Sequence, residues 1–487
     1  MDHSLRILFT VAEASPLVKV GGLGDVAGSL PLALRRIGHD VRIIMPHYGS
    51  INVERYQHHN RGSFVMPFFN NQESIVIDEV VLQDGTPVYL IGNERYFNRP
   101  AVYGEADDLE RFLLFSRVAM EVPKRIDWQP DILHSHDWHT GLVPALLKVD
   151  YRDDPFYSTC ASVYTIHNLA YQGWFDDSFA GRAGLYGYLP PPEDSVRGRS
   201  YSMIALGIYH SDLVSTVSKT YAAEIITAEY GMGQEMLLQR RQDNLTGILN
   251  GINYNQFNPS TDRIIPINFD IESIDKRVAN KLALQDKAGL LVNADTPLLG
   301  LAARLVDQKG IDILVNALDS LLNSSDVQFV LQGTGDHGYE EALTMLENRY
   351  PHKARMFFVL DFSLAQNIFA GCDMYLSPSR FEPCGLAHLI AMHYGAIPIV
   401  RRTGGLAETV EDCPLDLSSG SGFVFEKYSA DALLEAMNRA LIAFQQKEEW
   451  RRLMERCMKA DFSWRTTVQQ YETLYQKAKQ IGFRKSS

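Results

Sequence analysis

The sequence predicts an α/β protein made of two doubly wound domains, each a parallel sheet wrapped by helices. Short apolar runs alternate with longer amphipathic segments through most of the 487 residues, which is typical of this architecture. The chain is also too long for one ordinary domain, and the alternation stops once and then restarts. Strands are expected near residues 5–13, 41–46, 87–91, 131–134, 161–166, 213–217 and 246–249, and then near 298–305, 327–333, 354–360, 373–379 and 396–401.

The boundary between the domains is expected in residues 250–266, which are rich in Asn, Pro and Ser and show little periodicity. This division gives an N-terminal domain over 1–255 and a C-terminal domain over 256–464. We expect them to face each other across a deep cleft and to close over a ligand. A helix over about 465–487 is expected to pack back on the N-terminal domain. Its apolar residues recur at helical spacing: Val468, Tyr471, Leu474, Tyr475 and Ala478.

Composition and charge argue against several classes of protein. The net charge of −13 is unsuited to a nucleic-acid-binding protein, which needs a basic surface. No apolar run approaches the roughly 18 residues that span a bilayer, so no membrane association is expected. The five cysteines are scattered and never spaced as Cys-x-x-Cys, which is typical of a reducing compartment and predicts a cytoplasmic protein.

The first candidate binding element is the glycine-rich stretch KVGGLGDVAGSLPLAL, residues 19–34, which follows an apolar run and opens a helix. Glycine lets the backbone approach a ligand closely, and the start of a helix presents unpaired N–H groups. Beside Gly22, Lys19 adds a positive charge and Asp25 a hydrogen-bond acceptor. The stretch therefore predicts a site for a phosphate-bearing or sugar-bearing ligand.

The same stretch also fits a dinucleotide-binding fingerprint through Gly22, Gly24 and Ala27. In that fold the first glycine follows its strand almost at once, and an acidic residue ends the second strand. Here residues 15–20 intervene, and Asp40 precedes its strand, at the wrong edge of the sheet to reach a ribose. A nicotinamide-dependent enzyme is therefore the less favoured alternative.

Two further strand ends in the first half carry histidines: HSHDWHTG, residues 134–141, and His167 with Asn168. The spacing in 134–141 does not match a metalloprotease helix, and no helical glutamate accompanies it, so no zinc site is expected. Two interpretations of that loop stay open: Asp137 caps the next helix, or the loop offers hydrogen bonds to a polyhydroxylated ligand. For His167 a binding role is favoured, because ligands bind at the carboxyl ends of strands in open α/β sheets.

In the second half, three loops after strands combine glycine with charge. AARLVDQKG places Arg304 and Lys309 at a strand end, a pair of cations suited to a diphosphate. LQGTGD, residues 331–336, and TGGL, residues 403–406, are glycine turns that suit phosphate oxygens. Glu382 lies in a turn bounded by proline and glycine, where its carboxylate can accept hydrogen bonds from sugar or ribose hydroxyls.

The sequence lacks two motifs that are common in enzymes acting on phosphate-bearing substrates. There is no Gly-x-x-x-x-Gly-Lys-Ser/Thr loop, which excludes a P-loop nucleotidase. There is also no Asp-x-Asp pair, the common carboxylate clamp for a metal-bound sugar nucleotide. Cationic side chains and helix N-termini are then left to neutralise phosphate charge. Neither a metal ion nor another cofactor is expected.

Taken in order, these segments resemble the bacterial and plant glycogen/starch synthases over nearly the whole chain. Those enzymes are retaining glucosyltransferases of the GT-B fold, with two Rossmann-like domains facing a cleft. The resemblance implies transfer of glucose from ADP-glucose to the 4-hydroxyl at the non-reducing end of an α-1,4-glucan, so the implied partners are a nucleotide sugar and glycogen. The matching motifs are KVGGLGDV, HSHDWHTGL, TIHNLAYQG, ILNGIN, ARLVDQKG, QGTGD, PSRFEPCGL, VRRTGGLAETV and the terminal DFSW.

The resemblance also implies roles for individual residues. The catalytic residues are expected to be His167, beneath the transferring glucose, Arg304 and Lys309, on the diphosphate, and Glu382, orienting the donor. Retention is expected to proceed by attack of the acceptor hydroxyl on the leaving-group face, with the departing phosphate taking the proton. The donor-binding residues are expected to be Lys19, Gly22, Asp25, Asp137, Asn250, Lys281, Gly333, Thr334, Thr403, Gly404 and Gly405, with no metal ligand.

This chain departs from the family's pattern around the expected nucleotide base. Leu360 stands where an aromatic residue often stacks on the base, and His388 stands where glutamine is common. Two alternatives therefore stay open: a GT-B transferase that uses UDP-glucose or a small acceptor, and a catalytically silent α-glucan-binding protein. The sequence carries no signal for oligomeric state, regulation or preferred acceptor length.

Overall fold

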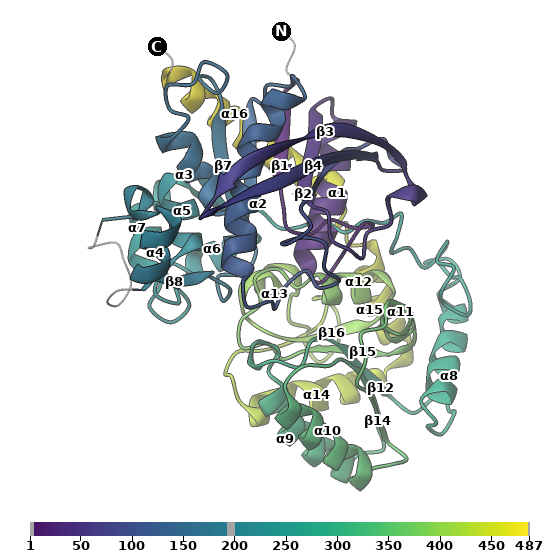
Figure 1. The fold of residues 1–487 in the computed structure, drawn as a ribbon. Coiled ribbons are helices and arrows are strands. Elements are labelled where there is room, and N and C mark those ends of the chain that lie inside the picture. Colours follow the sequence, from purple (N-terminus) through teal and green to yellow (C-terminus); the bar gives the residue numbers. More distant parts are fainter. Residues whose placement is uncertain (1–3, 192–199, 486–487) are drawn as a thin grey trace. The chain divides into compact units, whose positions relative to one another are not determined.

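The computed structural model describes residues 4–191 and 200–485. The chain forms two compact units. One joins Met1–Gly251 to the C-terminal Trp464–Ser487, and the other comprises Ile252–Ser463. Each unit is built around a mainly parallel sheet covered by helices, so the predicted α/β class is confirmed (Figure 1). No helix of the described residues is long and apolar enough to cross a membrane.

The first unit holds a sheet whose described strands run in the order β11-β10-β7-β6-β1-β2-β5-β4-β3. All neighbours pair in parallel except β4, which runs antiparallel to both β3 and β5. A separate antiparallel pair joins β8 to β9. The bounds are β1 Arg6–Thr10, β2 Asp40–Pro46, β3 Gln57–Phe68, β4 Asn71–Val81, β5 Pro87–Gly92, β6 Ile132–His136, β7 Ala161–Ile166, β8 Trp174–Asp176, β9 Ser200–Ser202, β10 Leu213–Thr216 and β11 Leu245–Gly247.

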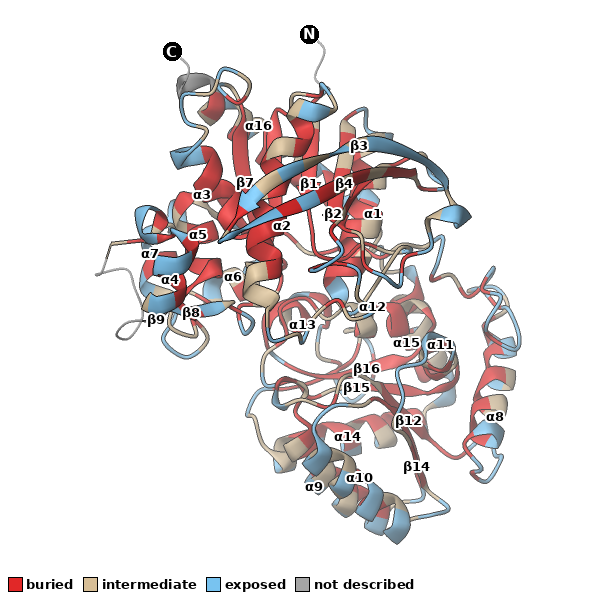
Figure 2. Ribbon diagram, in the orientation of Figure 1, coloured by how far each residue is buried: buried red, intermediate tan, exposed pale blue. Residues whose placement is uncertain are grey.

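Helices cover both faces of this sheet, because successive side chains of a strand point to opposite faces. In β1, Leu8 packs in a core shared with α2, α3 and α5, whereas Ile7 and Phe9 pack in a core shared with α1 and α16. All three side chains are fully buried, as is most of the sheet (Figure 2). The helices are α1 Gly22–Arg36, α2 Asp108–Arg125, α3 Leu142–Val149, α4 Asp177–Ala183, α5 Met203–His210, α6 Lys219–Glu224, α7 Glu235–Arg240 and α16 Trp464–Lys485.

The apolar-run criterion does not predict the ribbon formed by β3 and β4. The first five residues of β3, Gln57–Arg61, are polar and exposed on both faces. The strand exists because it pairs with β4 along nearly its whole length, with an irregularity between Asn60 and Gly62. Its conformation therefore depends on its neighbour more than on its own hydrophobicity.

The helix α16 belongs to the first unit although it lies at the end of the chain. It packs beside α1 and β7. The indole of Trp464 donates to the hydroxyl of Ser29 on α1 (2.7 Å). The hydroxyl of Tyr475 is hydrogen-bonded to Nδ1 of His134 on β6 (2.8 Å), and both residues are fully buried. Polar contacts therefore supplement the apolar stripe that the sequence shows.

The second unit contains a parallel sheet with the order β14-β13-β12-β15-β16-β17 among the described residues. The strands β12 to β16 coincide with the five apolar runs of the second half, and β17 was not predicted. Strand bounds are β12 Leu298–Ala302, β13 Gln328–Gln332, β14 Ala354–Phe357, β15 Met374–Ser377, β16 Ile397–Arg401 and β17 Phe423–Phe425. Helix bounds are α8 Arg277–Lys287, α9 Ile311–Ser324, α10 His337–Arg349, α11 Phe362–Gly371, α12 Leu386–His393, α13 Gly404–Thr409, α14 Ala430–Phe444 and α15 Lys447–Lys459.

The segment that follows the first unit is held by hydrogen bonds within the second unit. The amide of Ile252 donates to the carbonyl of Phe462 (2.7 Å), and the amide of Phe462 donates to the hydroxyl of Tyr254 (2.9 Å). Further on, Asp262 accepts from Gln366 (2.9 Å) and from the hydroxyl of Tyr394 (2.6 Å). The polar stretch 250–266 is thus an ordered part of the fold.

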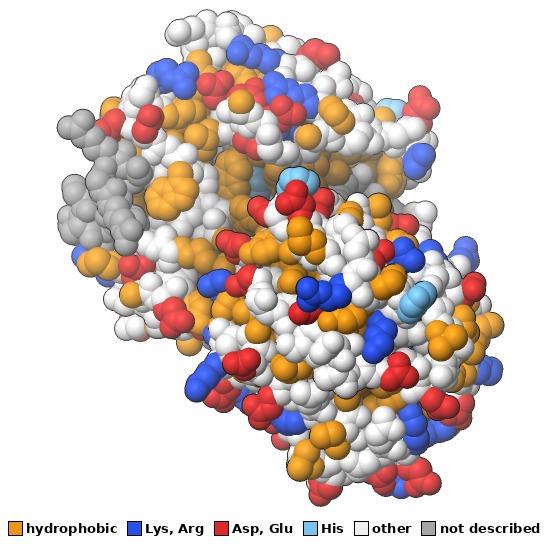
Figure 3. Space-filling view, turned by 90° about the horizontal axis from the view of Figure 1, so that it is seen from below, with side chains coloured by type: hydrophobic (Ala, Val, Ile, Leu, Met, Phe, Trp, Pro, Cys, Tyr) orange, Lys and Arg blue, Asp and Glu red, His pale blue; other side chains and the backbone are white. Residues whose placement is uncertain are grey.

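The surface charge agrees with the acidic composition. On the described part of the face drawn in Figure 3, Lys and Arg side chains are interspersed with Asp and Glu and form no broad basic area. A duplex-binding face needs a continuous basic patch, so this face does not suit nucleic acid.

Replacing Tyr475 by Phe is expected to lower the midpoint of thermal unfolding. The substitution removes the partner of His134 Nδ1 in a fully buried place, at a cost of about 1 to 2 kcal/mol. Tyr164→Phe is a matched control, because the buried Tyr164 hydroxyl has no hydrogen-bond partner among the described residues. Its removal is expected to leave the midpoint unchanged or raised. Equal losses in calorimetry of the two variants would contradict the assignment.

Candidate active site

The glycine-rich loop of the first unit lies between β1 and α1, as predicted. The ammonium of Lys19 contacts Oδ1 of Asp25 at 2.7 Å. A side chain at Gly24 would begin 3.1 Å from the Lys19 side chain and from the Glu13 carboxylate. The loop is therefore packed around its own charged groups, and α1 begins at Gly22.

Glu13, to which the sequence analysis gave no role, occupies the mouth of this loop. Its side chain is buried and accepts hydrogen bonds from the amides of Val20 and Gly21 and from the hydroxyl of Tyr103. Burial outweighs these hydrogen bonds and raises the pKa of the Glu13 carboxyl to about 7. The loop was expected to present open N–H groups. Two of its amides are instead bonded to a carboxylate of the protein.

Asp137 follows β6 and has a backbone φ of 54°, which is uncommon outside glycine. Helix α3 starts later, after Gly141, so Asp137 does not cap it. Its Oδ1 instead accepts from the amide of His167 (2.7 Å) and from the amide of Asn168 (3.4 Å). Of the two interpretations of this loop, the helix cap is therefore wrong. Burial raises the pKa of the Asp137 carboxyl to about 7.

The histidines of this edge are buried and in contact with one another. Nδ1 of His136 lies 3.0 Å from Nε2 of His167, and the rings of His134 and His136 are 4.0 Å apart. Desolvation lowers the pKa of all three, to about 3 for His167, so they are neutral near pH 7. Among the described residues there is no group of three or more His, Cys, Asp or Glu side chains that could hold a metal ion.

Asn250 lies just beyond β11 and is buried. Its side-chain oxygen is enclosed and accepts no hydrogen bond from the described residues. A buried amide oxygen without a donor is costly.

In the second unit, Lys309 and Glu382 meet although 73 positions separate them. The ammonium of Lys309 lies 2.6 Å from Oε2 of Glu382, and the hydroxyl of Ser379 donates to the same oxygen (2.9 Å). Glu382 is buried, whereas Lys309 is partly exposed. A buried carboxylate thus holds a cation whose outer side is accessible.

Close backbone approach explains the glycine turns beside this pair. A Cβ at Gly333 would lie 1.9 Å from the carbonyl oxygen of Ala303, and one at Gly404 would lie 1.9 Å from that of Glu382. These distances are sterically impossible for any other residue without a backbone shift. The amide of Leu305 donates to the carbonyl of Thr334 (3.1 Å). The loops of Arg304, Thr334 and Glu382 are therefore neighbours at the carboxyl ends of the strands.

Lys281 is the predicted donor-binding residue of the second unit that the structure does not bring to these loops. It lies on α8, is buried, and pairs with Asp373 (2.7 Å). Asp373 precedes β15 and accepts from the amide of Leu298 at the start of β12 (2.8 Å). The pair therefore lies at the amino ends of the strands, whereas the glycine turns lie at the carboxyl ends. Such a fully buried pair is a structural link between α8 and the sheet.

The residues that depart from the family's pattern differ in their surroundings. His388, on α12, is fully buried and hydrogen-bonded through Nε2 to the hydroxyl of Thr409 (2.6 Å). Burial lowers its pKa to about 3. Leu360, between β14 and α11, is 63% exposed, and Phe362, the first residue of α11, is 58% exposed. His388 thus serves packing, whereas Leu360 lies at the surface.

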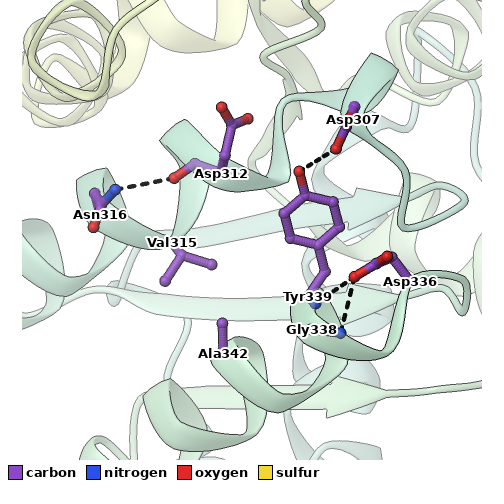
Figure 4. A pocket seen from close by; sticks show the side chains of 8 residues that line it. All are labelled: Asp307, Asp312, Val315, Asn316, Asp336, Gly338, Tyr339 and Ala342. Carbon is purple, nitrogen blue, oxygen red and sulfur yellow. Dashed lines mark hydrogen bonds between the residues drawn. The ribbon is translucent and has the colours of Figure 1, made fainter.

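A cavity of about 490 Å³ lies between α9 and α10 (Figure 4). Asp307, in the loop that carries Arg304 and Lys309, is one of its lining residues. Its carboxylates are engaged by the protein. Asp307 accepts from the hydroxyl of Tyr339, and Asp336 accepts from the first amides of α10. Asp312 pairs with Arg380 (3.1 Å). The lining residues are Asp307, Asp312, Val315, Asn316, Asp336, Gly338, Tyr339 and Ala342.

Known proteins resemble this chain over its whole length. Residues 6–240 match the starch synthase catalytic domain family, and residues 284–453 match the glycosyl transferases group 1 family. The glycogen synthase of Moorella thermoacetica is 44% identical over 481 residues, which cover 98% of each chain. That of Clostridium beijerinckii is 43% identical and covers 97% of this chain and 98% of its own.

Solved structures of glycosyltransferases also resemble this chain. The catalytic domain of starch synthase IV from Arabidopsis thaliana, bound to ADP and acarbose, has a TM-score of 0.92 and 35% identity, covering 98% of this chain and 100% of that one. Sucrose-phosphate synthase from Thermosynechococcus elongatus shares the fold, with a TM-score of 0.61 and 17% identity over 97% of this chain and 98% of its own. The protein is thus a glycosyltransferase with the GT-B fold. More narrowly, the chain belongs to the glycogen and starch synthase family, as the sequence motifs predicted.

Three groups beside the predicted residues escaped the sequence analysis: Glu13, Tyr103 and Ser379. Glu13 is hydrogen-bonded to the glycine-rich loop, Tyr103 donates to Glu13, and Ser379 donates to Glu382. Ser379, three residues before Glu382 in a polar turn, carried a local signal. Glu13 carried a weaker one, as a lone acid at the end of an apolar strand.

Glu13→Gln is expected to make thermal stability less dependent on pH. The folded protein holds the Glu13 proton more tightly than the unfolded chain does, because the pKa rises from 4.5 to about 7. The resulting stabilisation is full below pH 4.5 and is lost as the pH rises through 7, by about 3 kcal/mol. The Gln variant should therefore gain stability over the parent between pH 5 and pH 8. Calorimetry at both values tests this, with Glu341→Gln on exposed α10 as the control for losing one charge. A constant difference would contradict it.

Proposed function

We propose that this protein transfers glucose from ADP-glucose to the 4-hydroxyl at the non-reducing end of an α-1,4-glucan such as glycogen, with retention of the anomeric configuration. The observation that carries the proposal is the Lys309–Glu382 pair at 2.6 Å, set among glycine turns at the carboxyl edge of the second sheet. The ADP and acarbose bound by the Arabidopsis relative support a nucleotide and a glucan as ligands.

The second unit is proposed to handle the diphosphate. Glu382 holds Lys309 in one orientation, and Arg304 follows β12 two residues after its end. Negative charge on the leaving phosphate grows as the glycosidic bond breaks. Preoriented cations stabilise that charge more in the transition state than in the bound donor. The acceptor hydroxyl attacks on the same face, and its proton passes to the departing phosphate oxygen.

The first unit is proposed to hold the sugar through neutral groups. His167 and Asn250 are buried, uncharged and hydrogen-bonding, and the amide of His167 is fixed by Asp137. Such groups distinguish hydroxyls by direction and create no charge that competes with the phosphates. Because the proposed groups come from both units, transfer requires both parts of the chain.

Fewer residues of the structure bear on the nucleotide base than on the sugar and the diphosphate. The exposed Leu360 stands where the family often has an aromatic residue, which keeps UDP-glucose as a second candidate donor. Transfer of radiolabelled glucose to glycogen from ADP-glucose and UDP-glucose, side by side, decides between them. A protein that binds glycogen but transfers from neither would be a silent glucan-binding member of the family. A reducing, cytoplasmic location stays a prediction from the cysteines.

Glucan extension is expected to proceed without an added divalent metal. The reason is the missing Asp-x-Asp pair together with Lys309 and Arg304, which supply positive charge from the protein itself. The rate of transfer should be the same in excess chelator as in magnesium or manganese. Activity that vanishes with chelator and returns with metal would contradict the expectation.

Lys309→Ala or Arg304→Ala is expected to lower kcat/KM by at least about 100-fold, the cost of removing one preorganised charge. Because the leaving charge grows in the transition state, kcat should fall at least as much as donor affinity. Arg349→Ala is a matched control, since it removes an exposed cation at the C-terminal end of α10, where it pairs with Asp319 of α9. If only KM changes, the two residues bind the donor without assisting the reaction.

A further inference from the structure

The side chain of His136 has one polar contact in the structure, and that contact is with the ring of His167. Its Nδ1 lies 3.0 Å from Nε2 of His167, while its Nε2 is buried with no hydrogen-bond partner among the described residues. The His136 ring is fully buried, stacked on Phe9 with centroids 5.1 Å apart and tilted against His134 at 4.0 Å. The His136 ring has no role in the proposed function.

Two consecutive residues of the loop after β6 hold His167 from different sides. Asp137 fixes its backbone through the amide (2.7 Å), and His136 reaches its ring. In a regular strand, successive side chains point to opposite faces. The positive φ of 54° at Asp137 breaks that alternation and lets both groups reach one neighbour. A strained backbone at such a place is typical of a functional site.

The backbone of His136 is also fixed. Its amide donates to Oγ1 of Thr140 (2.6 Å), and the same hydroxyl donates to the carbonyl of His136 (2.8 Å). The stacked rings leave the imidazole no room to turn. The direction of its Nδ1 is therefore set before any ligand arrives.

The environment also decides which ring carries the shared proton. If His167 donated, His136 would carry its proton on Nε2, as a buried N–H without an acceptor. Orphaned buried N–H groups are rare because they lose their whole hydrogen-bond energy. If His136 donates from Nδ1, only a lone pair is left enclosed. His167 then accepts at Nε2 and carries its own proton on Nδ1.

We infer that His136 is a positioning residue that orients the ring of His167 and fixes its tautomer, so that His167 presents Nδ1–H as a hydrogen-bond donor to a sugar hydroxyl. This inference rests on the proposed function for the identity of the ligand. It does not rest on it for the proton assignment. Nδ1 of His167 makes no hydrogen bond to the described residues and is not one of their enclosed polar atoms, so this donor is open to a ligand.

Three substitutions separate positioning from packing. His136→Asn places an amide N–H near the former Nδ1 and should keep most of the activity. His136→Gln reaches toward the former Nε2, and His136→Phe keeps a ring without a donor. These two should lower kcat by roughly 10- to 100-fold with little change in KM, as expected when a reacting geometry loosens. His210→Phe, which removes a buried histidine bond to the carbonyl of Tyr188 in the segment after α4, controls for lost stability and should keep kcat.

A packing role for His136 gives the opposite order. The Phe variant would then be active, and the Asn variant would be impaired and less stable. That result would overturn the inference, as would a kcat of the Phe variant within about threefold of the parent.

Nitrogen-15 NMR of the histidine-labelled parent protein gives a second readout that needs neither a variant nor catalysis. Both His136 and His167 should show protonated Nδ1 and bare Nε2 near pH 7. A proton on Nε2 of His167 would overturn the inference even if the protein proves to be an active transferase. The expected tautomers in a protein that transfers from neither nucleotide would uphold the assignment while the proposed function failed.

Discussion

The parallel pairing of β6 with β7 is the constraint on which the histidine cluster of the first unit depends. His136 pairs in register with Thr165, and the amide of Asp137 extends the ladder to the carbonyl of Thr165 (3.0 Å). Parallel strands end at the same edge of a sheet. The residues at the end of β6 therefore lie beside those that follow β7, and His136 and Asp137 both contact His167. A slip of one residue would turn these side chains to the opposite face.

Burial affects the ionisable groups of the two units differently. In the first unit it raises the pKa of Glu13 and Asp137 and lowers that of His167. Groups that are ionised in water are thereby neutral or close to their titration point. In the second unit, Lys309 keeps one face accessible and is held by Glu382. A polyhydroxylated sugar is suited to the first environment, and a diphosphate to the second.

Local sequence signals predicted most strands of the two sheets, though not β3, β4 or β17, and the glycine turns, because apolar runs and strand-to-helix turns are properties of neighbouring residues. Contacts between distant segments were not predictable in this way. Lys281 matches a donor-binding lysine of the family in the sequence, yet Asp373, far along the chain, buries it at the opposite edge of the sheet. Glu13 follows the apolar strand β1, and only the folded loop shows that its carboxylate meets the amides of Val20 and Gly21.

The glycine turns of the second unit show why a motif and its function are separable. At Gly333 and Gly404 a side chain would collide with the carbonyls of Ala303 and Glu382, whether or not a ligand is bound. The first requirement for glycine there is the close packing of one loop on another. That packing in turn brings Glu382 to Lys309, so the position of the ion pair depends on backbone contact. A substitution at either glycine would therefore disturb the ion pair before it disturbed any contact with a nucleotide.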